Sequence, residues 1–204
     1  MDVEPPTQQI KDAIYNALQD ANQCVYNQAQ VEKSDMGTTG VVAYIWEGQG
    51  KQKAIVGSVG DSRAYIYRRG KVEQITLDDG IVKMVTKDDE QKARVIQARL
   101  NNVINPNDPS QLAPEERYLY DKRNLITQAI GTKNIVPNTY VIDLQPGDKL
   151  LLASDGVTDN LTDKEIANII AQSSNGQAAV KELTEISKSR SQDTRHLRHK
   201  QDGL

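Results

Sequence analysis

The spacing of apolar positions changes along the first half of the chain, and each change predicts an element. Apolar residues recur every three or four positions after Thr7, at Ile10, Ile14, Leu18 and Val25. This spacing predicts an amphipathic helix of about five turns, packed through one face. From Gly40 onward, β-branched and aromatic residues fill four short segments separated by glycine-bearing turns: 41–46, 53–59, 63–68 and 72–76. We expect these segments to form an antiparallel meander.

The second half predicts further helices and two strands. A polar helical pattern runs from 81 to 100, a loop rich in Asn, Pro and Asp covers 101–114, and a short helix is expected over 125–130. Strands are expected at 140–144 and 149–153, the second central in its sheet because both its faces are apolar. Thr162 and Glu165 form a capping box that starts one helix, and another spans 177–188. These elements predict one α+β domain with antiparallel strands and outer helices.

Composition and charge narrow the function classes. The 204 residues carry a net charge of -3, too small a field to favour a nucleic-acid or membrane partner. No apolar run is long enough to span a bilayer, and the N-terminus has no signal-peptide pattern, so we expect a cytoplasmic protein. The one cysteine, Cys24, is expected to be a small packed side chain. His196 and His199 lie in a polar tail, where we expect solvation rather than metal binding.

Acidic residues gather directly after predicted strands. They are Asp61, the pair Asp78 and Asp79, and the pair Asp155 and Asp159. Asp155 follows the most apolar strand and precedes a glycine, a position suited to holding a hard cation near the backbone. Aspartates next to glycine also accept N–H groups within turns, which is the structural alternative for Asp61 and Asp155. The residues alone leave both interpretations open.

Five motifs, in order, resemble those of the type-2C metal-dependent serine/threonine protein phosphatases. They are MGTTGVVA (36–43), VGDSRAY (59–65), QITLDDG (74–80, with Asp79 where the family usually has histidine), RNLITQAIG (123–131) and PGDKLLLASDGVTD (146–159). The resemblance implies a two-layer antiparallel β-sandwich flanked by helices. It also implies hydrolysis of phosphoserine and phosphothreonine in phosphorylated proteins, by water activated at two Mn²⁺ or Mg²⁺ ions.

The same resemblance assigns roles to individual acidic residues. Asp155, Asp78 and Asp202 are the implied metal ligands, with Asp193 a weaker candidate for the place of Asp202. Asp159 is the implied neighbouring carboxylate, which supports the centre without touching the metal. Residues 81–121 correspond to the variable flap beside the active site. Asp61 and Arg63 are expected to be structural residues of their hairpin, with a functional role as the alternative.

The sequence also departs from the family pattern. No segment resembles the DGMGGH motif with its metal-bridging aspartate, and the general-acid histidine, the phosphate-binding arginine and the final strand have no match. We therefore expect one truncated domain over 1–204, incomplete at both ends, with an N-terminal extension (1–6) and a polar tail (190–204). We expect little metal binding or activity, and self-association through exposed strand edges. The alternative is a catalytically inactive pseudophosphatase or a phosphoprotein-binding module.

Overall fold

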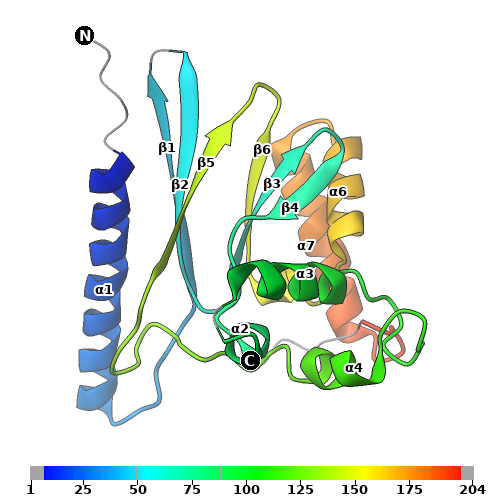
Figure 1. The fold of residues 1–204 in the computed structure, drawn as a ribbon, viewed down its shortest axis with the longest axis horizontal. Helices are drawn as coiled ribbons and strands as arrows, with labels where there is room; N and C mark the ends of the chain where they lie inside the picture. Colours follow the sequence, from blue (N-terminus) through cyan, green and yellow to red (C-terminus); the bar gives the residue numbers. More distant parts are fainter. Residues whose placement is uncertain (1–6, 49, 88, 199–204) are drawn as a thin grey trace.

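Two three-stranded antiparallel sheets stack face to face, with helices outside them (Figure 1). The computed structural model describes residues 7–48, 50–87 and 89–198. One sheet has the order β1-β2-β5 and the other β4-β3-β6. The strands are β1 (Gly40–Gly48), β2 (Lys51–Val59), β3 (Arg63–Arg68), β4 (Lys71–Gln74), β5 (Asn138–Leu144) and β6 (Lys149–Ala153). This arrangement confirms the predicted β-sandwich.

The first four strands do not form one meander, which corrects the prediction. β1 pairs with β2, and β3 with β4, but β2 and β3 lie in different sheets. The chain crosses between the sheets at residues 60–62. Gly60 has a φ of +93°, and a Cβ at this position would overlap the side chain of Thr39. Both observations require glycine at this crossing.

Two other predictions about local structure were wrong. β6 lies at an edge among the described strands, where it pairs with β3, and its Leu152 is 41% exposed. Residues 125–130 do not form a helix. Instead Ile126 bridges to Gly80, and Ile130 exchanges two backbone hydrogen bonds with Thr38, at 2.8 and 2.9 Å. The backbone groups are thus satisfied by distant segments rather than by a helical turn.

The interior between the sheets is aliphatic. Val56, Ala64, Ile66 and Ile75 are buried there, and β5 and β6 add the partly buried Ile142, Leu144 and Leu150. Burial of this apolar surface is the main force that holds the two layers together.

Helix α1 (Thr7–Glu32) covers the outer face of the first sheet, as its apolar spacing predicts. Its Ile14 and Leu18 pack against Ile55 and Val59 of β2. A Cβ on Gly57 would overlap Ile14, so the glycine allows the helix to approach the strand closely.

Three helices follow β6 on the second sheet: α5 (Asp155–Thr158), α6 (Asp163–Gln172) and α7 (Gly176–Gln192) (Figure 1). The predicted capping box is confirmed, because Thr162 Oγ1 accepts from the Glu165 N–H and Glu165 accepts from the Thr162 N–H. Ile166 and Leu183 of these helices pack with Leu151 of β6.

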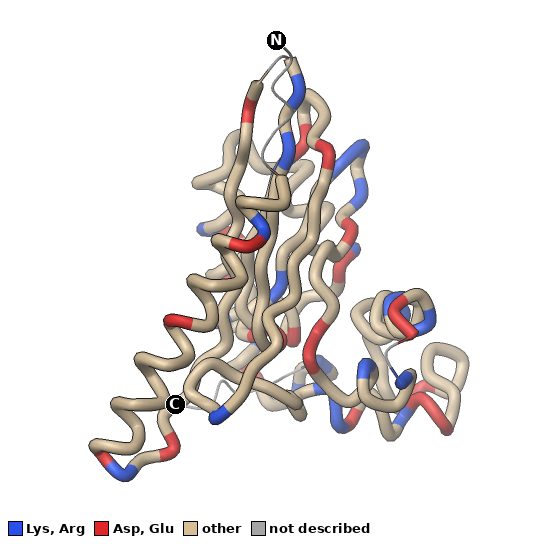
Figure 2. The backbone as a smooth tube through the Cα atoms, turned by 60° about the vertical axis from the view of Figure 1, so that its left-hand side comes forward, with Lys and Arg blue, Asp and Glu red and all other residues tan. Residues whose placement is uncertain are grey.

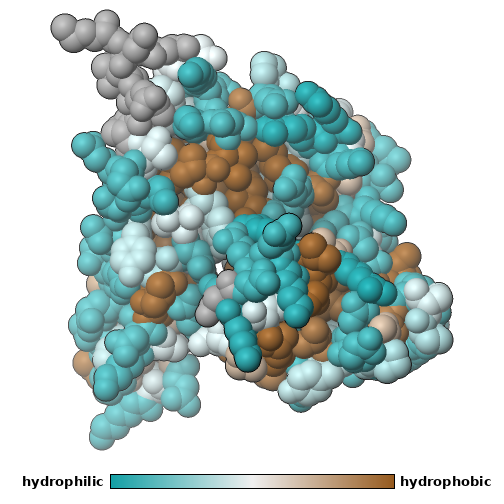
Figure 3. Space-filling model, in the orientation of Figure 1, coloured by the Kyte–Doolittle hydropathy of each residue, from teal (hydrophilic) through white to brown (hydrophobic). Residues whose placement is uncertain are grey.

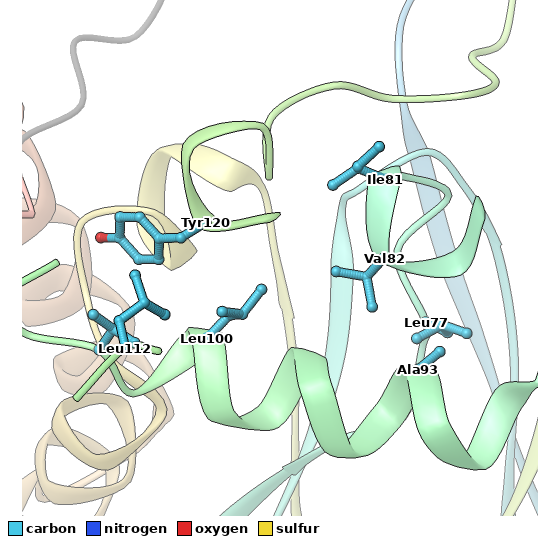
Figure 4. Packing of buried hydrophobic residues seen from close by; sticks show 8 residues of the cluster. Leu77, Ile81, Val82, Ala93, Leu100, Leu112 and Tyr120 are labelled. Atoms are coloured by element: carbon cyan, nitrogen blue, oxygen red, sulfur yellow. The ribbon is translucent and has the colours of Figure 1, made fainter. Parts of the chain in front are cut away.

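The region between β4 and β5 forms its own apolar cluster. It contains α2 (Ile81–Val85), α3 (Glu90–Asn101) and α4 (Pro114–Asp121). Figure 4 shows Leu77, Val82 and Ala93 gathered at one end of α3, and Leu100, Leu112 and Tyr120 at the other. The described part of the chain contains no helix that is both long and apolar enough to cross a membrane.

Candidate active site

Turns that leave the second sheet position the predicted acidic residues. Residues 75–80 join β4 to α2 and carry Asp78 and Asp79, whereas Asp155 lies two residues after the end of β6 and begins α5. Asp159 lies one helical turn after Asp155, and its N–H donates to the Asp155 carbonyl at 2.8 Å. Asp155 is half-buried, while Asp78, Asp79 and Asp159 are buried.

Asp78 is engaged by an arginine across the β3–β4 hairpin. Arg63 Nη2 lies 2.7 Å from Asp78 Oδ2, Arg63 Nε lies 3.0 Å from Oδ1, and Gln74 Nε2 donates to Oδ1 at 2.9 Å. Arg63 also donates to the Tyr65 hydroxyl. Burial lowers the pKa of Arg63, but the charge of Asp78 and the hydrogen bonds raise it well above its ordinary value. Arg63 is thus a structural residue of its hairpin, and the metal role of Asp78 stays a prediction.

Asp79 connects four segments, a role that the sequence did not reveal. Its carboxylate accepts from the Gly60 N–H at 3.0 Å, Lys83 Nζ at 2.9 Å, Gln128 Nε2 at 2.6 Å and Asn138 Nδ2 at 2.9 Å. These groups come from the β2–β3 crossing, α2, the loop before β5 and β5 itself. The only feature of the sequence that pointed to a special role at this position was an aspartate where the family usually has histidine. A fixed anion here holds together segments that are up to 78 positions apart in the chain, at Gly60 and Asn138.

A small cavity brings Asp78 and Asp159 together with three arginines. The space open to the centre of a water-sized sphere is about 20 Å³. We call it the arginine cavity, and its charged lining residues are Arg63, Asp78, Arg123, Asp159 and Arg198. Arg123 Nε lies 3.7 Å from Asp159 Oδ1, and its guanidinium stacks over the Tyr120 ring at 4.2 Å. Asp155 is not among the lining residues.

The C-terminal segment contributes an arginine to this cavity, although the sequence predicted a polar tail. Arg198 is 3% exposed and donates to the carbonyl oxygens of Val103, Thr158 and Leu161. One side chain thus connects the loop after α3 to α5. A lone arginine in a hydrophilic segment carries no periodic signal, so sequence reasoning could not find this contact.

A wider groove lies between β4, α3 and α6, with about 640 Å³ open to water-sized spheres. Val72, Val95 and Ala98 give it an apolar lining, and Lys71 and Lys164 bring positive charge. Asp163 also lines the groove, and burial raises its pKa. Figure 2 shows acidic and basic residues interspersed along the chain.

The described residues do not by themselves fit a two-metal centre. Within 7–48, 50–87 and 89–198, no three acidic, histidine or cysteine side chains are grouped so that they could hold a metal ion. Both oxygens of Asp78 already accept hydrogen bonds from Arg63. Asp202 lies outside the described residues, and Asp193 pairs with Arg195 on the surface. Asp155 remains the candidate ligand whose position, at the end of β6, agrees best with that role.

Comparison with known proteins gives the same family from sequence and from structure. Residues 2–100 match the family model described as "Protein phosphatase 2C". The chain is 31% identical over 164 residues to protein phosphatase PhpP of Streptococcus pneumoniae, with 79% of the chain and 56% of that protein covered.

Solved structures agree with this match. The serine/threonine phosphatase of S. agalactiae is 26% identical, with a TM-score of 0.68 over 97% of this chain and 70% of that one. Stp1 from Staphylococcus aureus is 27% identical, with a TM-score of 0.68 over 93% and 65%.

The fold is a phosphatase-like β-sandwich, and the chain is similar to type-2C protein phosphatases in both sequence and structure. The family is metal-dependent. The chain spans about half the length of the curated relatives that it matches.

Proposed function

We propose that this chain is a large part of a phosphoserine/phosphothreonine protein phosphatase that uses Mn²⁺ or Mg²⁺ and acts on phosphorylated proteins. The observation that carries the proposal is the position of Asp155. It stands half-buried at the point where β6 meets α5, within the motif that most closely resembles the family. A carboxylate held at the end of a strand, next to a glycine, is suited to a hard divalent cation.

The metal centre would need ligands beyond those that the described residues group together. Divalent ions in such a centre activate water and neutralise phosphoryl oxygens. We therefore expect little turnover from the chain as given. The cytoplasmic location predicted from the sequence stays a prediction.

A second candidate function is a phosphoprotein-binding module without catalysis. The ion pair of Asp78 with Arg63 favours it, because a carboxylate already neutralised by arginine is a weaker metal ligand. The apolar groove beside β4, with Lys71 and Lys164 on its lining, is suited to a phosphopeptide.

One set of assays separates these functions. Turnover of para-nitrophenyl phosphate is measured with Mn²⁺, with Mg²⁺ and with chelator, for the unmodified chain, Asp155→Asn and the control Asp143→Asn. Asp143 is an exposed residue of β5, paired with Lys53. The phosphatase proposal expects weak, metal-dependent turnover that Asp155→Asn abolishes and Asp143→Asn retains. Phosphopeptide binding without turnover, measured by fluorescence anisotropy, would support the binding module instead. Turnover that Asp155→Asn leaves unchanged contradicts the assigned role of Asp155.

We also propose that the chain self-associates through strand edges. β1, β5, β4 and β6 are the edge strands of the two described sheets, and exposed edges favour pairing between chains. Val42 and Ile45 of β1 are 40% and 56% exposed. Figure 3 shows hydrophobic side chains gathered over the strands between α1 and α3. Size-exclusion chromatography with light scattering tests this proposal: a dimer or larger species is expected, and a monomer at high concentration would contradict it.

A further inference from the structure

A lysine amine, a side-chain amide and a carboxylate meet where α2 approaches the start of β5. Lys83 Nζ, from α2, donates to Asn138 Oδ1 at 3.0 Å and to Asp79 Oδ1 at 2.9 Å. Asn138 Nδ2 donates to the same Asp79 oxygen at 2.9 Å. Each of the three side chains thus contacts the other two, although Lys83 and Asn138 are 55 positions apart in the chain.

The carboxylate between the other two groups is fixed from a further side. Asp79 Oδ2 accepts from the Gly60 N–H at 3.0 Å and from Gln128 Nε2 at 2.6 Å. The Asp79 side chain is 1% exposed, whereas that of Lys83 is 24% exposed. A nucleophile within hydrogen-bond reach of a base, with the base oriented by other groups, is the arrangement expected of nucleophilic attack. In this cluster Lys83 is the nucleophile and Asp79 is the base.

We propose that Lys83 and Asn138 become joined by an isopeptide bond, an amide between Lys83 Nζ and Asn138 Cγ. The carbon that is attacked is bonded to Asn138 Oδ1, so it lies one C=O bond, about 1.2 Å, from an atom that Nζ already contacts. Folding therefore removes much of the entropic cost of bringing the two reactants together. The alternative is a cluster held by hydrogen bonds and an ion pair alone.

The reaction balances without any further reactant. Asp79 takes a proton from the Lys83 ammonium, because a base within about 2.6–3.2 Å can accept it directly. The neutral amine attacks Asn138 Cγ, and the bond from Cγ to Nδ2 breaks as the new bond forms. Two protons in all pass from Nζ through Asp79 to the departing nitrogen, which leaves as ammonium. The Asp79 carboxylate is thereby restored.

The bond has a structural consequence for the region between β4 and β5. It would enclose residues 84–137, a loop that contains α3 and α4, and would anchor this region to β5 of the first sheet. A covalent link that closes a long loop lowers the entropy of the unfolded chain and so stabilises the fold. The proposal does not depend on phosphatase activity, and its failure would leave the proposed function unaffected.

Mass spectrometry of the denatured, unmodified chain tests the bond directly. The intact mass should be lower than the mass of the sequence by one ammonia. Because trypsin does not cleave after a linked lysine, the digest should contain a branched peptide that joins residues 72–87 to residues 134–149. The full sequence mass, both in a fresh sample and after prolonged incubation, would overturn the proposal. So would a loss of ammonia without the branched peptide.

Lys83→Arg separates the chemistry from the ion pair. Arginine keeps the positive charge and the donors but stays protonated, so it cannot attack the amide. This variant should keep its full sequence mass and unfold at a midpoint about 5–15 °C below that of the unmodified chain. Loss of ammonia that persists in Lys83→Arg, or equal midpoints, would contradict the proposed bond.

Lys53→Arg is the matched control, because Lys53 pairs with the exposed carboxylate of Asp143 on β5. It should retain the loss of ammonia and the branched peptide. Asp79→Asn removes the base and should also keep the full sequence mass. If Asp79→Asn does not fold, the unmodified chain and Lys83→Arg still decide the question.

Discussion

Asp79 and Asp155 each follow a strand of the second sheet and precede a glycine, yet their surroundings differ. Asp79 is 1% exposed and accepts hydrogen bonds from four segments of the chain. Asp155 is half-buried and begins a short helix at the rim of the sandwich. The same residue type at the same kind of position is thus buried in one turn and partly exposed in the other. Burial, rather than the place in a motif, distinguishes the two carboxylates.

The largest effect is expected from Asp79→Ala. The change leaves the Lys83 ammonium, the Gly60 N–H and the Asn138 amide without their common acceptor, and should lower the free energy of unfolding by about 3–5 kcal/mol. Urea unfolding measures this loss. Asp143→Ala removes an exposed ion pair and should cost less than about 1 kcal/mol. Equal effects of the two changes would remove the distinction between a structural acid and a surface acid.

A double-mutant cycle sharpens the comparison at Asp78. Arg63 and Asp78 are 7% and 9% exposed, so removing either partner leaves the other as an unpaired buried charge. Arg63→Met and Asp78→Asn should each cost about 3 kcal/mol, and the double variant clearly less than their sum. Unfolding free energies of the four proteins give the coupling. Strict additivity would show that the two residues act independently, and would leave Asp78 available to a metal.

A smaller effect on the free energy of unfolding is expected from Glu165, at the start of α6. Glu165 caps α6 and pairs with Arg190 at 2.6 Å. Burial raises the pKa of Glu165, but Arg190 and Thr162 outweigh it and bring the pKa to about 2. Because the folded pKa lies below the ordinary value, the stabilisation is present above about pH 4.5 and is lost as the pH falls toward 2.

Since the Glu165 side chain is 35% exposed, solvent screening reduces this contribution to about 1 kcal/mol. Unfolding free energies of Glu165→Gln and the unmodified chain should differ at pH 6 and converge near pH 2. A difference that stays constant with pH would contradict the assignment.

The sequence predicted local features well and long-range ones poorly. The helix that starts at Thr7 and the capping box at Thr162 were found because their signals lie within a few residues. Helix α4 was missed, although Pro114 at its first turn and the Glu116 carboxylate, which accepts from the Ala113 N–H, are local signals. Ile126 and Ile130 were misread as helical because their partners, Gly80 and Thr38, are remote in the chain.

In the candidate site, too, the sequence predicted individual residues but not the contacts between distant ones. Family-like motifs identified Asp155 and Asp78, but the pairing of Asp78 with Arg63 and the role of Asp79 depend on packing between elements. The burial of Arg198 depends on tertiary contacts with Val103 and Thr158. No periodicity in the sequence predicts such contacts.

Manganese binding, measured by electron paramagnetic resonance of free Mn²⁺ during a titration, tests whether Asp155 is a metal ligand. We expect weak binding by the unmodified chain, at least about tenfold weaker binding by Asp155→Asn, and no change for Asp143→Asn. Urea unfolding of Asp155→Asn should match that of the unmodified chain. If Asp155→Asn keeps its manganese affinity, Asp155 is a turn residue like Asp79 and the proposed metal role is wrong.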